Sequence, residues 1–251
     1  MNVRKKAIRS AGALPPVRNR VAEKPSMATS PRTKAKRPHH RAVAVLKGCD
    51  ARLAEVIAAI GPYRPALHDP GFPSLVRAIV NQQVSKAAGD TILRRLYALF
   101  ADGVPEANAL LKLTTRRLRS VGLSGRKVEY LRDLAKHIVD GQIDFDALAH
   151  LPDEVVIERL TAVRGIGRWT AEMYLLFTLG RPDVLPLGDV ALVNVVREMY
   201  ELPPEADAEH FGAIAEAWKP WRGVAVWYLY RSINTQRAAA AAAKAALRAK
   251  S

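Results

Sequence analysis

Two features of this sequence, separated by about twenty residues, carry residue types that could do chemistry. The first is the run Val163-Arg-Gly-Ile-Gly167, in which two glycines one residue apart permit a tight hairpin. Unpaired backbone N–H groups would open the helix after it, which predicts an anion site that suits a DNA phosphate. The second is Asp189, an isolated acid in the run Leu185-Pro-Leu-Gly-Asp189. Its carboxylate could stabilise positive charge or simply cap the helix expected from Val190.

Helices are expected on both sides of the hairpin, because apolar residues recur there every three or four positions. The residues that carry this pattern are Val155, Val156, Leu160 and Val163 before the hairpin, and Trp169, Met173, Leu176 and Phe177 after it. The unit is therefore predicted to be helix, Gly-x-Gly hairpin, helix. Similar spacing recurs along the chain and no segment alternates as a strand would, so the body is predicted to be all-α.

The positive charge of the chain is concentrated at its ends. The formal net charge is +15 over 251 residues, of which 49% are hydrophobic. Residues 1–40 hold eleven basic residues and one acid, and residues 237–251 hold four basic residues and no acid. The 1–40 segment has few large apolar residues and is predicted to be a disordered tail. It could attract nucleic-acid phosphates, or it could be a solvated tail with no specific role.

The single cysteine, Cys49, excludes a disulfide framework and any cysteine-based metal site. No run of about 18 apolar residues exists, so no membrane helix is expected. The basic N-terminus lacks the apolar core of a secretory signal, although an organellar transit peptide stays open as an alternative. We expect the protein to act in the reducing interior of a cell.

Several of these segments resemble one protein family. The similar segments are Gly165-Ile-Gly-Arg-Trp-Thr-Ala-Glu172, the acid at Asp189, the Gln-Gln-Val-Ser of segment 72–88, and Trp218-Lys-Pro-Trp-Arg222. Together they are similar to the 3-methyladenine DNA glycosylase II branch of the helix-hairpin-helix (HhH-GPD) base-excision DNA glycosylase superfamily, over about residues 41–236. The resemblance implies an all-α, two-lobed helical fold.

The chain is thereby predicted to have three parts. Composition predicts a disordered basic tail at 1–40 and an Ala-rich basic tail at 237–251. Between them, the resemblance implies the HhH-GPD DNA glycosylase domain at 41–236, with its hairpin at 160–170 and its catalytic loop at 181–189.

The activity that the resemblance implies is base excision from DNA. Breaking the bond between C1′ of the sugar and the base builds positive charge on the sugar, which an ionised Asp189 would stabilise. Lyase members carry Lys where this chain has Trp169, and an indole cannot form a Schiff base, which implies a monofunctional, hydrolytic enzyme. The implied substrates are alkylated purines of the 3-methyladenine and 7-methylguanine type. Two alternatives stay open: a glycosylase for deaminated or oxidised bases, and a non-enzymatic helix-hairpin-helix DNA-binding protein.

The resemblance assigns roles to individual residues. Asp189 would be catalytic, and Trp169, Met173 and Tyr230 would bind the flipped base, with core packing as the alternative for Trp169 and Met173. Gln83 would be the wedge that fills the gap left by the flipped base, with Gln82 beside it; solvent-facing glutamines are the alternative. The implied DNA contacts are Gln82, Gln83, Arg164, Gly165, Gly167 and Arg168. Arg126 and Lys127, at a predicted helix start, are further candidates for phosphate contacts.

No cofactor is expected to be required, and the one cysteine excludes an iron–sulfur cluster. Relatives hold a monovalent cation, Na⁺ or K⁺, in the hairpin, and here the backbone carbonyls of Thr161, Val163 and Ile166 would supply its ligands. The expected partner is double-stranded DNA with damaged bases, bound by a monomer without a membrane. The implied location is the cytoplasmic nucleoid of a bacterium or the nucleus of a eukaryote.

Overall fold

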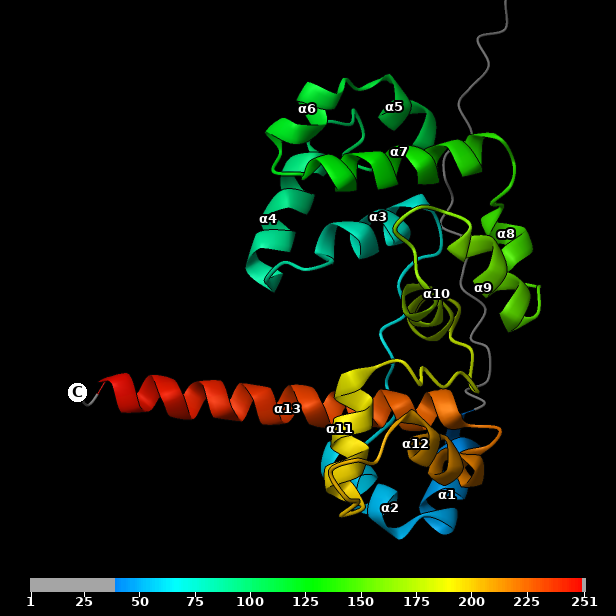
Figure 1. Ribbon diagram of the computed structural model, residues 1–251, viewed down its shortest axis with the longest axis vertical. Coiled ribbons are helices and arrows are strands. Elements are labelled where there is room, and N and C mark those ends of the chain that lie inside the picture. Colours follow the sequence, from blue (N-terminus) through cyan, green and yellow to red (C-terminus); the bar gives the residue numbers. More distant parts are fainter. Residues whose placement is uncertain (1–38, 250–251) are drawn as a thin grey trace, which may run out of the picture. The chain divides into compact units, whose positions relative to one another are not determined.

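The computed structural model describes residues 39–249, and within that range the chain forms helices and no strand (Figure 1). The predicted all-α class is therefore confirmed. The prediction of a disordered tail at 1–40 falls almost entirely outside the described residues. No helix between residues 39 and 249 combines the length and the apolar character needed to span a membrane.

The helices follow one another along the chain with short connections. Their bounds are α1 His39–Cys49, α2 Ala51–Ile60, α3 Phe72–Asn81, α4 Lys86–Tyr97, α5 Ala107–Lys112, α6 Thr115–Ser120, α7 Gly125–Val139, α8 Phe145–Leu148, α9 Asp153–Thr161, α10 Arg168–Tyr174, α11 Val190–Met199, α12 Ala208–Ala215 and α13 Arg222–Ala249. A π-helical turn, Leu175–Leu179, continues α10, and a 3₁₀ turn, Glu216–Trp218, follows α12.

The helices pack in two groups. Helices α3 to α7 contact one another, and α1, α2, α11, α12 and α13 form the second group. Helix α10 contacts α3 and α9, and Figure 1 shows α10 between the groups. Each group buries apolar residues at helical spacing, including Leu75, Ile79 and Val80 of α3.

Local sequence explains several helix starts. Ser124 accepts a hydrogen bond from the backbone N–H of Lys127, and Asp207 accepts from Glu209 and His210, so each serves as an N-cap. Pro73 lies in the first turn of α3, where its missing N–H costs nothing. The Ala-rich residues beyond 236 continue α13 as far as Ala249.

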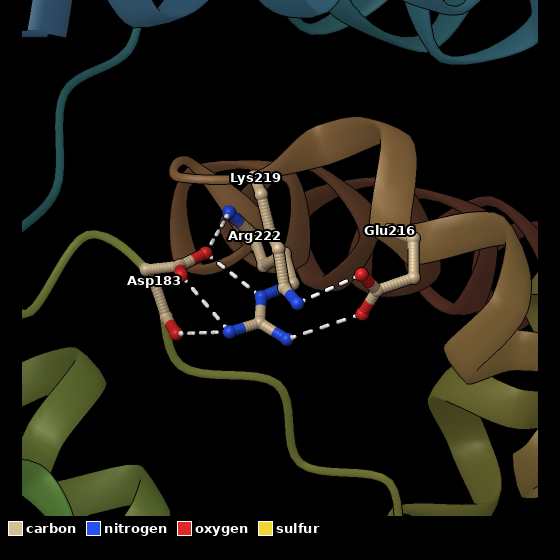
Figure 2. Close-up of polar contacts among 4 residues, drawn as sticks. All are labelled: Asp183, Glu216, Lys219 and Arg222. Carbon is tan, nitrogen blue, oxygen red and sulfur yellow. Dashed lines mark hydrogen bonds and ion pairs between the residues drawn. The ribbon is translucent and has the colours of Figure 1, made fainter.

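An ion pair fixes the loop 181–189 to the start of α13. Asp183 binds Arg222 through two side-chain bonds, 2.8 Å from Nε to Oδ1 and 2.9 Å from Nη2 to Oδ2, and it also accepts the backbone N–H of Arg222 (Figure 2). Figure 2 shows Glu216 on the other side of the guanidinium, paired with Lys219 at 2.7 Å. Because a two-bond arginine–carboxylate pair has a fixed geometry, it sets where α13 begins relative to the loop.

Gly223 lets α13 approach this loop closely. A Cβ atom at Gly223 would lie 2.7 Å from the carbonyl oxygen of Arg181 and 2.9 Å from that of Pro182. The backbone N–H of Gly223 also donates to the Pro182 carbonyl at 2.8 Å. Any side chain at position 223 would therefore push the helix away from the loop.

We expect Gly223→Ala to lower the free energy of unfolding by about 1–3 kcal/mol, because backbone carbonyls cannot move aside as side chains can. Denaturant unfolding of the purified protein measures this. Gly48→Ala in α1 is the matched control, since a Cβ there meets nothing within 4 Å, and it should be neutral or slightly stabilising. Equal stability of Gly223→Ala and the wild type would contradict the close-approach argument.

Candidate active site

Asp189 is held by four hydrogen bonds from three parts of the chain. Its Oδ1 caps α11 by accepting the backbone N–H groups of Ala191 at 2.8 Å and Leu192 at 3.1 Å. Its Oδ2 accepts from Nε1 of Trp169 and from the hydroxyl of Tyr230, both at 2.6 Å. The residue is only 8% exposed. The helix-cap role considered from the sequence is thus present, and the cap occupies one of the two carboxylate oxygens.

The hydrogen bonds keep Asp189 ionised. Burial raises the pKa of its carboxyl, but the bonds from Tyr230, Trp169 and the two backbone N–H groups outweigh burial and leave the pKa below its ordinary value. The pKa of the Tyr230 hydroxyl is raised, first by burial and then by its bond to Asp189. At neutral pH the pair is therefore a carboxylate and a neutral phenol.

A second aspartate has the same set of donors. Asp50 caps α2 through the backbone N–H of Leu53, and its Oδ2 accepts from Nε1 of Trp218 at 2.7 Å and from the hydroxyl of Tyr200. Trp218 is completely buried, whereas Trp169 is 46% exposed. The donor set alone therefore identifies a well-held carboxylate, and the exposed indole is what distinguishes Asp189.

The exposed face of Trp169 lines a cavity of about 1120 Å³. This volume slightly exceeds the usual range of small-molecule pockets. Met173, one turn further along α10, lines it as well, so both predicted base-binding residues of α10 face open space. Tyr230 is not part of the lining, but its hydroxyl lies 3.5 Å from the Met173 sulfur. Asp189 is not part of the lining either, and it meets the cavity wall through Trp169.

The cavity wall includes an aromatic residue, Phe177, to which the sequence pattern gave no role beyond apolar helical spacing. Phe177 lies on the π-helical turn that continues α10, lines the cavity, and has its ring centroid 5.8 Å from that of Tyr230. In the sequence, the spacing of Phe177 is the same as that of a core residue. Only the π-helical turn, which is visible in the structure, indicates that it lines the cavity. Such turns inside helices are often found at functional sites.

Gln83, the predicted wedge, and Gln82 beside it have different surroundings. Gln82 is half-buried, and its Nε2 donates to the carbonyl of Gly165 at 2.8 Å. Gln83 is exposed, lines the cavity, and has a positive φ of 53°. A non-glycine residue in this region is uncommon and strained. The alternative of two solvent-facing glutamines therefore fits Gln83 alone.

Only one of the two hairpin glycines has the positive φ that the sequence pattern suggested. Gly165 has φ 81°, and a Cβ there would lie 2.2 Å from the ring of Tyr130. Gly167 has an ordinary φ of −91° and open space around its Cβ position. It begins α10 without a side-chain cap. The tight hairpin therefore depends on Gly165, and Gly167 leaves the first N–H groups of α10 uncovered.

Comparisons with known proteins identify the family of this chain. A model of the HhH-GPD superfamily of base excision DNA repair proteins matches residues 76–221, more than half of the chain. The chain belongs to this superfamily. The DNA-3-methyladenine glycosylase 1 of Schizosaccharomyces pombe is 32% identical over 193 residues, which cover 74% of this chain and 84% of that protein.

Two solved structures of superfamily members are similar in fold. The S. pombe 3-methyladenine DNA glycosylase in complex with abasic DNA matches with a TM-score of 0.69 at 31% identity, over 76% of this chain and 95% of that one. A DNA-3-methyladenine glycosidase from Bacillus halodurans matches with a TM-score of 0.70 at 36% identity, over 76% and 88%. The HhH-GPD fold expected from the sequence is thus confirmed.

The basic residues near the hairpin of this HhH-GPD protein differ in their availability. Arg168 is shared between Glu154, at 2.7 Å, and the buried Glu172, at 3.1 Å. Arg164 is exposed, and its side chain has no ion pair within residues 39–249. A phosphate would therefore have to compete for Arg168 but could bind Arg164 directly.

Lys127, considered from the sequence as a phosphate contact, points elsewhere. Its ammonium donates to the carbonyls of Val80 at 2.7 Å and Gln82 at 2.8 Å. Desolvation by burial lowers its pKa. The adjacent Arg126 is exposed and makes no ion pair within the described part of the chain, so of these two residues it is the one free to bind a phosphate.

The carbonyls expected to hold a monovalent cation belong to the last residue of α9, Thr161, and to Val163 and Ile166 in the turn that follows. The Val163 carbonyl accepts the N–H of Ile166 at 3.1 Å, which leaves one of its lone pairs for another partner. Across residues 39–249, no group of three or more His, Cys, Asp or Glu side chains could hold a metal ion. The cation therefore remains a prediction that rests on backbone oxygens.

We expect Tyr230→Phe to raise the pKa of Asp189 in the folded protein, because one of the bonds that lower this pKa is removed. Tyr228→Phe on the same helix is the matched control: it removes the bond from Tyr228 to the Gly61 carbonyl and should leave the pKa of Asp189 unchanged. A carbon-13 NMR titration of the carboxyl groups measures both.

The sign of the stability effect follows from the same shift. Wild-type Asp189 stabilises the fold above its unfolded-state pKa, and this contribution is lost as the pH falls through the lower folded-state pKa. The difference in the free energy of unfolding between wild type and Tyr230→Phe should therefore become smaller at acid pH. If this difference stayed constant from neutral to acid pH, the hydrogen bond from Tyr230 to Asp189 would be contradicted.

Proposed function

We propose that this chain is a monofunctional DNA glycosylase that flips alkylated purines, of the 3-methyladenine and 7-methylguanine type, out of DNA and removes them by hydrolysis in base excision repair. The observation that carries the proposal is the ionised Asp189 bonded to the exposed Trp169 at the edge of the cavity. The names of the relatives support the substrate class. A protein that only binds DNA would need the hairpin but not this carboxylate.

The electrostatics of Asp189 suit the reaction. Leaving of the base builds positive charge at C1′, and an ionised carboxylate lowers the energy of that state without moving. Because its pKa is below the ordinary value, Asp189 keeps its charge but is a poor acceptor of protons. Its main part is therefore charge stabilisation and orientation of the attacking water, with only weak general-base help.

The cavity suits a base that is already a good leaving group. An N-alkylated purine carries positive charge and leaves as a neutral base, so no strong general acid is required. The indole face of Trp169 attracts such a cation by about 0.5–2 kcal/mol, and the Met173 sulfur adds a polarizable contact. Flipping costs less for a damaged base than for a normal one, which adds to the selection.

We expect Asp189→Asn to slow single-turnover release of 3-methyladenine or 7-methylguanine from methylated duplex by roughly 10²–10³-fold, the scale for loss of a preorganised electrostatic group. Binding to the damaged duplex should persist, because little charge exists at C1′ before the bond breaks. Asn can still cap α11, so the variant should remain folded, although it loses the carboxylate oxygen that accepts from Trp169 and Tyr230.

Asp50→Asn is the matched control, since Asp50 has the same donors but its tryptophan is buried. It should cost stability and leave the rate of base release intact. If Asp189→Asn kept full activity, the carboxylate role would be lost. Asp183, the other acid of this loop, is a poor replacement because Arg222 already binds both of its oxygens. If the wild type released only deaminated or oxidised bases, the protein would instead be a glycosylase for those bases.

We expect borohydride to trap no covalent enzyme–DNA complex, because an indole stands at position 169 and cannot form a Schiff base. The lysine that lines the cavity is Lys127, whose ammonium is engaged by two carbonyls. The measurement is gel electrophoresis after borohydride treatment on a damaged duplex. A crosslinked band would overturn the monofunctional assignment, and its loss in Lys127→Met would identify the amine.

A further inference from the structure

One face of α7 contacts both loops that are expected from the sequence to contact DNA, the Gln82–Gln83 loop and the hairpin. Lys127, Tyr130 and Asp133 are spaced three residues apart, so they lie along one side of the helix. Lys127 holds the end of α3, where the wedge loop Gln82–Gln83 begins. Asp133 accepts the backbone N–H of Arg164, the residue before the first hairpin glycine, at 2.8 Å.

The wedge loop and the hairpin are also joined directly. Nε2 of Gln82 donates to the Gly165 carbonyl at 2.8 Å. The ring of Tyr130 lies against Gly165 so closely that no side chain could be accommodated there. The wedge loop, the hairpin and α7 therefore form one connected unit, with Lys127 as the tie between α7 and the wedge loop.

Lys127 has no competing role in the described part of the chain. It pairs with no acid there, and its ammonium serves carbonyls at the C-terminal end of α3, where a helix leaves carbonyls without intrahelical donors. A cation is also favoured at this end by the helix dipole. These two carbonyls take two of the three N–H donors of the ammonium, so a phosphate could use only the third without breaking one of these bonds.

Gln83 follows directly after a residue that Lys127 holds. Its positive φ of 53° is a strained conformation for a residue with a side chain, and such strain persists only where the surroundings impose it. The backbone on the N-terminal side of Gln83 is fixed by Lys127 through the Gln82 carbonyl and by the hairpin through the Gln82 amide.

We propose that Lys127 is a positioning residue for base flipping: by holding the carbonyls of Val80 and Gln82 it keeps the wedge loop in the strained conformation that presents Gln83 to the duplex. The inference rests on the proposed function, since it assigns a means of flipping to that same site. Without the tie, Gln83 would leave the left-handed conformation, and the gap left by a flipped base would close. Asp189 and the cavity wall at Trp169 would be unaffected.

The test compares Lys127→Met with Lys136→Met, an identical change on the exposed surface of the same helix. The first readout is the fluorescence of 2-aminopurine placed at the lesion position of a duplex, which rises when the base leaves the stack. At saturating protein, Lys127→Met should lose this rise while Lys136→Met keeps it. Lys127→Arg retains the cationic donors and should restore most of the rise.

The second readout is single-turnover release of 7-methylguanine. Lys127→Met should slow release from a fully paired duplex by roughly tenfold or more, since flipping costs a few kcal/mol there. The loss should be smaller when the lesion lies opposite an abasic residue, where pairing no longer opposes flipping. Thermal unfolding verifies that each variant is folded. If Lys127→Met is not folded, Lys127→Gln, which is uncharged and shorter, replaces it.

Three outcomes would overturn the inference. A decrease of about one in the salt slope of DNA binding for Lys127→Met would make Lys127 a phosphate contact. An equal loss of rate on both duplexes would place its effect in the chemistry or the fold. An unchanged fluorescence rise would show that the wedge does not need the tie. Failure of the wild type to release any base would instead overturn the proposed function, and the fluorescence experiment would still decide the role of Lys127.

Discussion

The site depends on holding one negative charge in a nearly buried position without a counter-ion. Burying an ionised carboxylate is costly unless donors replace the water that it loses. Asp189 receives four donors, all of them neutral, from α10, α11 and α13. No ion pair to Asp189 exists within residues 39–249. Neutral donors keep the carboxylate ionised without cancelling its charge, so the full charge stays available to a positive neighbour.

The requirement for these donors explains much of the surrounding packing. Tyr230 must arrive from α13, and the Asp183–Arg222 pair together with the close approach at Gly223 sets where α13 begins. Trp169 must arrive from α10, whose start is set by the hairpin at Gly165. Three features outside the site, the ion pair, the close approach at Gly223 and the turn at Gly165, thus determine whether the two side-chain donors meet on one oxygen.

Asp50 shows that the same donor set can serve structure alone. Both aspartates cap a helix and accept from one tryptophan and one tyrosine, yet Trp218 is sealed in the core while Trp169 opens onto the cavity. The chemistry therefore depends on which carboxylate can be approached by a substrate. Packing decides this access, because Asp50 and Asp189 accept nearly the same number of hydrogen bonds.

The sequence by itself determined the features that depend on neighbouring residues. Apolar periodicity placed the helices around 160–180, the glycine pattern located the hairpin, and the isolated acid at Asp189 stood out from its Leu-Pro-Leu-Gly approach. The caps at Ser124 and Asp207 depend on local sequence in the same way, because Ser and Asp are preferred residue types at helix starts. These were predictable because helix spacing, turn conformation and capping are decided within a few residues of chain.

Only the tertiary structure decided which side chains share a partner. Tyr230 reaches Asp189 across 41 residues, and Gln82 reaches Gly165 across 83. Lys127 binds carbonyls of α3 although its position at a helix start suggested a phosphate contact. Likewise, the pattern of two glycines did not reveal that Gly165 alone takes the positive φ, because the ring of Tyr130 that crowds it comes from another helix. Contacts of this kind depend on how helices that are distant in the sequence pack together, and the spacing of residues along the chain does not predict that packing.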